Sequence, residues 1–301
     1  MNHFPSGAHD HDHEPLPGDD RPHKRCPIPS VPHLATGALL RYYRVQGNWS
    51  YQRVQERTGI SDRRLHGIEL ARRPLEEDVA RTLLDIYGAG QEAQAAAALL
   101  SGGHVHEARD QVFQRGSWVM ALKAAAQEAV LLSTGPLRLA CDLAAPAAPT
   151  PGRAQYRCRT LLLLHEPALH RTSVQQLARL IALVERRSLT VRLVPGGLSV
   201  PEGLLTEWSL TAGISDTSAA ECQRRQLYVT HIPGQAPWAR NGEPAHPERQ
   251  LIQLAALRAR TPLDSVHQLR QATVRPRIWT TGGGKSPARS ASADPAARRL
   301  A

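Results

Sequence analysis

The feature that most constrains this fold is a glycine turn between two short, serine-capped helical segments at residues 50–70. Ser50 and Ser61 each precede a helical segment, and a serine hydroxyl there accepts a hydrogen bond from a free backbone N–H of the first turn. Gly59 suits the backbone conformation that a sharp turn needs. The apolar positions that would pack between the two helices are Val54, Ile60, Leu65 and Ile68. The segment therefore predicts two helices packed at a sharp angle.

Helical segments on both sides extend this pair to a five-helix unit over residues 34–104. Before it, Leu39, Leu40 and Tyr43 recur at helical spacing. After it, Pro74 and the acidic run 76–78 favour a helix start, because proline fits the first turn and acids interact well with the helix dipole. An alanine-rich segment at 91–100 and a Ser-Gly-Gly break close the unit.

Residues 105–274 predict a second, mixed α+β domain with a few strands among helices. Residues 105–134 are predicted to be helical, with an interruption near Gly116. Proline-rich residues 144–153 are typical of a linker or long surface loop. Strands are predicted at 160–164, 189–194, 208–210 and 227–232, and helices at 174–187 and, as a pair, over 247–272.

The two ends of the chain are predicted to be disordered tails. Residues 1–33 contain seven prolines and five acidic residues with almost no large apolar side chains, so they bury too little surface to offset their ordering entropy. The alternation of His9, His11 and His13 is interpreted as part of a solvated tail, with metal chelation as the alternative. Residues 275–301 are rich in Pro, Gly, Ser and Arg.

The positive charge of the chain is concentrated in two places. The formal net charge is +10, from 37 basic and 27 acidic residues. Residues 41–73 carry +5, from eight arginines against three acids, whereas residues 74–104 carry −4. The last 32 residues carry +6, which would add salt-sensitive, non-specific affinity for a polyanion. A localised basic face on the capped helix pair favours a nucleic-acid partner.

Several protein classes are disfavoured by the sequence. No apolar run approaches the roughly 18–20 residues of a membrane-spanning helix, and the N-terminus lacks the pattern of a secretory signal. Four scattered cysteines without a CxxC pair are typical of a reduced cytosolic protein. The sequence has no GxSxG, Walker, HExxH or Rossmann glycine motif, so we expect no enzyme, no cofactor and no metal site. His165, Glu166 and His170 are interpreted as ordinary polar residues.

The helix pair resembles the repressor-type helix-turn-helix of the xenobiotic-response-element and Cro class. The run that carries the resemblance is Trp49-Ser50, Val54, Thr58-Gly59-Ile60-Ser61, Leu65, Ile68-Glu69 and Arg72-Arg73-Pro74. The resemblance implies a five-helix DNA-binding domain that acts as a homodimer on paired half-sites of double-stranded DNA. It also implies structural roles for Gly59 at the turn and for Glu69, which would pair with either Arg41 or Arg44.

The helix around Ser61–Ile68 is then the recognition helix, whose N-terminal turns enter the major groove. The side chains nearest the bases would be Ser61, Asp62, Arg63 and Arg64. Arginine is well suited to pairing with guanine, whereas Asp62 would either cap the helix, which we favour, or accept from cytosine. The predicted phosphate contacts are Ser50, Tyr51, Arg72 and Arg73. Two residues are expected to weaken the helix pair. Gln55 stands where the family has a small residue, and Gly67 lowers helix stability by roughly 1 kcal/mol relative to alanine.

A second resemblance covers residues 161–272. These residues look like the C-terminal domain of many actinobacterial regulators of this type, with a strand ending at Glu166, a Gln176-Leu177 pair and a strand closing on Val194-Pro195. The resemblance implies an antitoxin-like domain that senses an effector or binds a small protein encoded nearby. We therefore predict a cytoplasmic, nucleoid-associated, dimeric, sequence-specific transcriptional regulator. The alternative is an antitoxin-like protein-interaction module whose DNA binding is secondary or vestigial.

Overall fold

The computed structural model of the chain describes residues 29–101, 113, 115–135, 137–145, 158–198, 200–210 and 225–274. The predicted C-terminal tail lies outside these residues, as do most of the predicted N-terminal tail and linker. The His9, His11 and His13 alternation also lies outside them.

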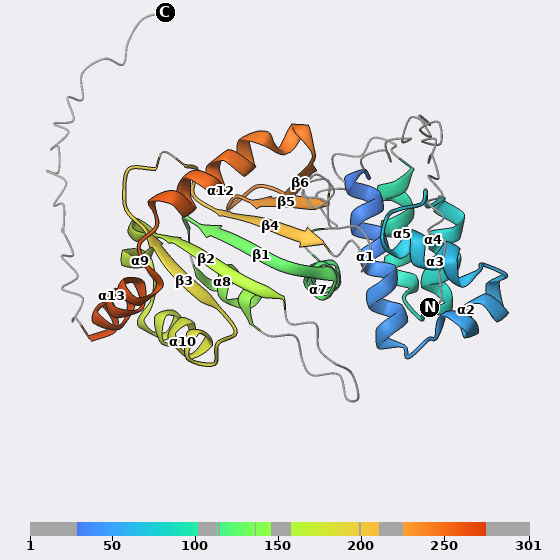
Figure 1. Ribbon diagram of the computed structural model, residues 1–301, viewed down its shortest axis with the longest axis horizontal. Coiled ribbons are helices and arrows are strands. Elements are labelled where there is room, and N and C mark those ends of the chain that lie inside the picture. Colours follow the sequence, from blue (N-terminus) through green and yellow to red (C-terminus); the bar gives the residue numbers. More distant parts are fainter. Residues whose placement is uncertain are drawn as a thin grey trace, which may run out of the picture.

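The N-terminal half is the predicted all-helical unit, shown in blue to teal in Figure 1. Its helices are α1 (Val31–Gln46), α2 (Tyr51–Thr58), α3 (Asp62–Glu69), α4 (Glu77–Ile86) and α5 (Gly90–Leu100). Apolar side chains from all five helices meet in one core, and those with no more than 1% exposure include Leu39, Leu40, Val54, Leu65, Ile68, Leu83, Leu84 and Leu99. The five-helix prediction is confirmed.

The C-terminal half is built on a six-stranded mixed sheet of order β3-β2-β1-β4-β5-β6. Its strands are β1 (Ala126–Ser133), β2 (Arg159–His165), β3 (Thr190–Val194), β4 (Leu204–Leu210), β5 (Gln226–His231) and β6 (Trp238–Asn241). Strands β1, β2 and β3 run parallel, and β4, β5 and β6 extend the sheet by antiparallel pairing from β1. Strand β5 runs in the same direction as β1, so the carboxyl ends of β1, β2, β3 and β5 all lie at the same end of the sheet.

Helices cover both faces of this sheet, which gives the mixed α/β architecture that the sequence predicts (Figure 1). Helices α8 (Leu137–Ala144), α9 (Glu166–Arg171), α10 (Val174–Glu185) and α13 (Pro262–Val274) contribute to one apolar core with Leu131 and Leu162. Helix α12 (His246–Arg258), which follows the short helix η1 (Glu243–Ala245), packs on the opposite face with Leu132 and Leu163. The alternation of neighbouring leucines between the two cores follows from the two-residue period of a strand.

The prediction that residues 105–134 are helical is wrong for their last third. Helix α7 (Gly116–Ala125) ends at Ala125, and the chain continues directly into β1. Strand β1 contains residues that favour helices when isolated, but it pairs on both edges, with β2 and with β4. Propensity is a weak preference, and burial between two strands outweighs it. The short strand β6 was also not predicted.

Helix α7 joins the two halves of the molecule. It packs against α1, although the sequence places it beyond the predicted domain boundary at residue 104. The carboxylate of Glu92, on α5, accepts hydrogen bonds from Trp118 Nε1 at 2.8 Å and Ser117 Oγ at 2.6 Å. At a second junction, the Arg225 guanidinium donates to the backbone oxygen of Leu70 at the end of α3. The end of the predicted recognition helix thus contacts the sheet domain directly.

Candidate nucleic-acid interface

The local geometry of α2 and α3 follows from their serine caps and the glycine between them. Ser50 Oγ accepts from the backbone N–H of Arg53 at 3.1 Å, and Ser61 Oγ accepts from that of Arg64 at 3.4 Å. Gly59 adopts a left-handed conformation with φ of 71°, and its N–H donates to the oxygen of Gln55 at 2.8 Å. These contacts place the N-terminus of α3 immediately after the turn.

A buried ion pair holds α3 against α1. Arg44 Nε lies 2.5 Å from Glu69 Oε1, and Arg44 Nη2 lies 3.0 Å from Glu69 Oε2. The same guanidinium donates to the backbone oxygen of Trp49 at 3.1 Å and lies over the ring of Tyr51, 3.9 Å from its centroid. The sequence left Arg41 and Arg44 as alternative partners of Glu69, and in the structure the carboxylate pairs with Arg44.

Tyr51 belongs to this network through its hydroxyl group. The hydroxyl donates to Glu69 Oε2 at 2.8 Å and lies 3.1 Å from His66 Nδ1. Burial and the nearby Glu69 charge raise the pKa of Tyr51 to about 12. The ring therefore connects the start of α2 to the end of α3, and the phosphate contact suggested for Tyr51 stays a prediction.

The N-terminal end of α3 exposes the four side chains that the sequence places nearest the bases: Ser61, Asp62, Arg63 and Arg64. Arg64 lies 3.8 Å from Glu76 in an ion pair whose side chains are both largely exposed. Within the described ranges, Arg63 has no ion-pair partner within 4 Å. Ser61 is the N-cap residue and Asp62 is the first residue of α3, where its negative charge interacts favourably with the helix dipole.

The two residues expected to weaken the helix pair each have a specific contact. Gln55 Oε1 accepts from the backbone N–H of Asp62 at 3.3 Å, so this side chain links α2 to the start of α3. A Cβ atom at Gly67 would lie only 3.0 Å from Cγ and Cδ of Arg73. Gly67 therefore leaves room for the Arg73 side chain to cross α3, while its carbonyl oxygen accepts from the N–H groups of Arg72 and Arg73 at 2.8 and 3.2 Å.

Sequence reasoning missed two exposed arginines on α2. The guanidinium carbons of Arg53 and Arg57 lie 4.2 and 5.4 Å from the centroid of the Trp49 ring. A guanidinium stacked on an aromatic ring keeps its in-plane N–H groups free for phosphate oxygens. The four-residue spacing of Trp49, Arg53 and Arg57 was the signal that would have found them.

Comparison with known protein families gives one match, and it falls on this part of the chain. Residues 35–98 match a helix-turn-helix domain. The match spans most of α1 to α5 and supports a DNA-binding regulator. No curated protein and no solved structure matches the chain. None of the helices in the described ranges has the length and hydropathy that crossing a bilayer requires.

The described histidines of the C-terminal half do not form a cluster with metal-ligand geometry. Glu166 Oε1 accepts from Arg260 Nε at 2.8 Å, which joins the start of α9 to the turn before α13. His165 is buried, and its burial lowers the pKa of the imidazole. Across the described residues, no group of three or more His, Cys, Asp or Glu side chains is arranged to hold a metal ion.

Proposed function

We propose that this protein is a sequence-specific DNA-binding transcriptional regulator whose recognition helix is α3. The proposal rests on the way α3 is held: its N-terminal turn is exposed to solvent, and its opposite face is packed into the core. Arg63 and Arg64 are exposed on its first turn, whereas Leu65, Ile68 and the Arg44–Glu69 ion pair hold its other face in the core. A rigidly held helix that presents arginines at its N-terminus suits readout of guanine in the major groove.

The length of α3 supports action as a homodimer. Its eight residues span about 12 Å, so one copy contacts only a few base pairs. Two copies that bind paired half-sites would double the sequence that is read. The stacked arginines Arg53 and Arg57 on α2, together with Arg73, would contact the phosphates on either side of the groove.

The C-terminal half is proposed to be the sensing or partner-binding part of a cytoplasmic regulator. Two contacts would connect it to DNA binding: the packing of α7 on α1, and the hydrogen bond from Arg225 to the end of α3. No catalytic role is proposed for either half, and double-stranded DNA is the proposed partner.

Replacement of Arg63 by alanine tests the proposal. We expect Arg63→Ala to lower affinity for DNA from the protein's own promoter by about 1–3 kcal/mol, with a smaller loss on scrambled DNA. Arg138→Ala is the matched control, because Arg138 is an exposed arginine on α8 in the sheet domain. Fluorescence anisotropy at one fixed salt concentration measures both. The assignment of α3 is refuted if the Arg63 and Arg138 variants bind promoter DNA equally well.

One observation favours a second function, an antitoxin-like protein-interaction module. Leu257 on α12 and Leu263 on α13 are each 84% exposed, close together along the chain. Exposed large apolar side chains mark protein contacts when they cluster. Co-purification of the wild-type protein and of a Leu257→Ser, Leu263→Ser variant with the small proteins encoded nearby tests this function. A partner that the wild type retains and the variant loses would support it, and equal recovery would contradict it.

A further inference from the structure

A cavity of about 200 Å³ lies in the sheet domain, between the first turns of α12 and the edge of the sheet where β1 and β5 end. Its walls are mainly apolar and include Leu132 of β1, Leu205 of β4 and Leu251 of α12. Ligand sites in open α/β sheets occur preferentially at the carboxyl ends of the strands. The position of the cavity thus fits a binding site for a small molecule.

Two residues that line the cavity have buried polar atoms without a hydrogen-bond partner in the described part of the chain. These atoms are Trp238 Nε1, a donor, and Glu248 Oε2, an acceptor. The other carboxylate oxygen of Glu248 accepts from Arg240 Nη1 at 3.1 Å. A buried polar atom left unpaired costs free energy, and native structures contain few of them. A ligand that supplies one acceptor and one donor would satisfy both.

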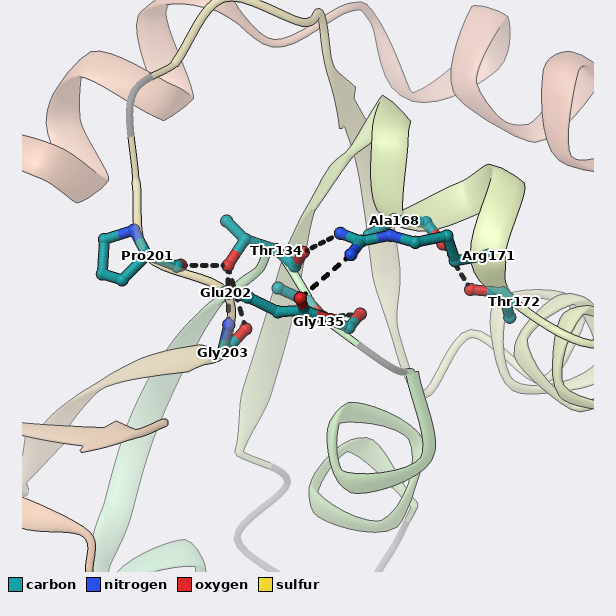
Figure 2. Close-up of polar contacts among 9 residues, drawn as sticks. Thr134, Gly135, Ala168, Arg171, Thr172, Pro201, Glu202 and Gly203 are labelled. Atoms are coloured by element: carbon teal, nitrogen blue, oxygen red, sulfur yellow. Dashed lines mark hydrogen bonds and ion pairs between the residues drawn. The ribbon is translucent and has the colours of Figure 1, made fainter. Parts of the chain in front are cut away.

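One wall of the cavity is held in place by a hydrogen-bond network that Figure 2 shows. Thr134 Oγ1 donates to the backbone oxygen of Pro201 at 2.7 Å and accepts from the N–H of Gly203 at 2.9 Å. Arg171 donates to the backbone oxygen of Thr134 at 2.9 Å and forms a 3.0 Å ion pair with Glu202. This wall is therefore preorganised, so binding of a ligand loses less conformational entropy.

The charges around the cavity favour a neutral ligand. The carboxylate of Glu248 is already paired with Arg240, so it needs a hydrogen-bond donor more than a second cation. Burial lowers the pKa of His231, another lining residue, to about 4, so this imidazole is uncharged at neutral pH. An anionic group would instead meet the Glu248 carboxylate in an apolar surrounding, which is costly.

We propose that this cavity binds a small, neutral, mainly apolar molecule that carries a hydroxyl group. The hydroxyl would donate to Glu248 Oε2 and accept from Trp238 Nε1, or the two contacts would be shared with a second polar atom of the ligand. A cavity of about 150 Å³ holds benzene. The volume here accordingly suits one ring with a short alkyl chain, or an aliphatic molecule of similar size.

Strand β5 connects the cavity to the recognition helix. Thr230 and His231, at the end of the strand, line the cavity, and Arg225, immediately before its start, donates to Leu70 at the end of α3. An effect of the ligand on DNA affinity would rest on the proposed function. Binding of the ligand to the cavity does not rest on it, because binding is measured on the full chain without DNA.

Isothermal titration calorimetry with three matched probes tests the proposal. 4-Propylphenol has the hydroxyl, propylbenzene lacks it, and 4-propylbenzoate replaces it with an anion. We expect one site per chain for 4-propylphenol, an affinity at least about tenfold weaker for propylbenzene, and no measurable binding of 4-propylbenzoate. Equal binding of the phenol and the hydrocarbon, or no binding of either, would overturn the proposal.

Three variants locate the probe in this cavity. Leu251→Trp fills the cavity and should abolish 4-propylphenol binding, whereas Leu254→Trp adds the same side chain at an exposed position of α12 and should not. Trp238→Phe removes the indole N–H and also makes the side chain smaller, so propylbenzene serves as the reference for the change in packing. The variant should weaken 4-propylphenol severalfold more than propylbenzene. Circular dichroism checks that each variant is folded. Unchanged binding to both the Leu251 and Trp238 variants would place the probe elsewhere and refute the assignment.

Discussion

Removal of the Glu69 carboxylate should destabilise the helical half far more than removal of an exposed carboxylate. Glu69 makes two contacts with Arg44, at 2.5 and 3.0 Å, with side-chain exposures of 1% and 9%. It also accepts from the Tyr51 hydroxyl. Glu69→Ala would leave the buried guanidinium without this partner, which costs about 3–5 kcal/mol. That is a large share of the 5–15 kcal/mol that stabilises a typical domain.

Glu77→Ala is the matched control for this experiment. Glu77 pairs with Arg81 at 2.6 Å, a similar distance, but the two side chains are 38% and 49% exposed. Exposed pairs one helical turn apart contribute only about 0.3–0.5 kcal/mol. Urea unfolding of both variants, followed by circular dichroism, measures the difference. A Glu69→Ala loss within about 1 kcal/mol of the Glu77→Ala loss would refute the reasoning from burial.

A double replacement separates an unpaired charge from a lost contact. Arg44→Met with Glu69→Leu removes both charges and keeps apolar volume at the site. Since replacing a buried ion pair by apolar residues is often neutral or stabilising, we expect the double variant to recover part of the stability lost by Glu69→Ala. A double variant less stable than Glu69→Ala would contradict this expectation and would indicate that the other contacts of Arg44, with the Trp49 oxygen and the Tyr51 ring, outweigh the unpaired charge.

Three further predictions concern two glycines and the pH dependence of stability. In Gly59→Ala the new Cβ meets no atom within 4 Å, but alanine is forced into a left-handed conformation, which costs about 1–2 kcal/mol. In Gly37→Ala the new Cβ would lie 2.7 Å from the Ile68 oxygen, and this clash should cost about 1–3 kcal/mol. Urea unfolding measures both variants; wild-type stability would contradict backbone strain at Gly59 or the steric clash at Gly37. Burial lowers the pKa of His231 from its ordinary value of 6.5 to about 4, so folding opposes its protonation and stability is lost as pH falls between these values. His231→Gln should make stability fall less steeply over this range, and an unchanged slope would contradict that assignment.

The helical half was largely predictable from the sequence because its signals are local. A serine cap, a turn glycine and apolar residues three or four positions apart each act within a few residues, and α2 to α5 lie close to where these patterns place them. Helix α1 begins at Val31, three residues inside the predicted N-terminal tail. Exposure of Arg63 and Arg64 follows from the same periodicity. The choice of Arg44 as the partner of Glu69 was less accessible, because both candidates lie on one helix and only packing decides between them.

The sheet domain was predictable only in outline. Strands β2 and β3 and helices α10, α12 and α13 have the expected patterns, but β1 consists of residues that also suit a helix. Its identity as the strand that joins the parallel and antiparallel parts of the sheet depends on β2 and β4, which lie far along the chain. The cavity beside α12 was not foreseen, because its walls come from four strands and a helix that no local pattern brings together.

The sequence by itself determined the capped helix pair, the basic character of residues 41–73 and the presence of both helices and strands in the second half. These features follow from residue content or from interactions between residues close together in the chain. Tertiary structure decided the partner of Glu69, the docking of α7 on the helical half, the strand state of β1 and the placement of Trp238 and Glu248 in the lining of one cavity. Each of these depends on contacts between distant segments, whose free energy outweighs local preference only once the chain has folded.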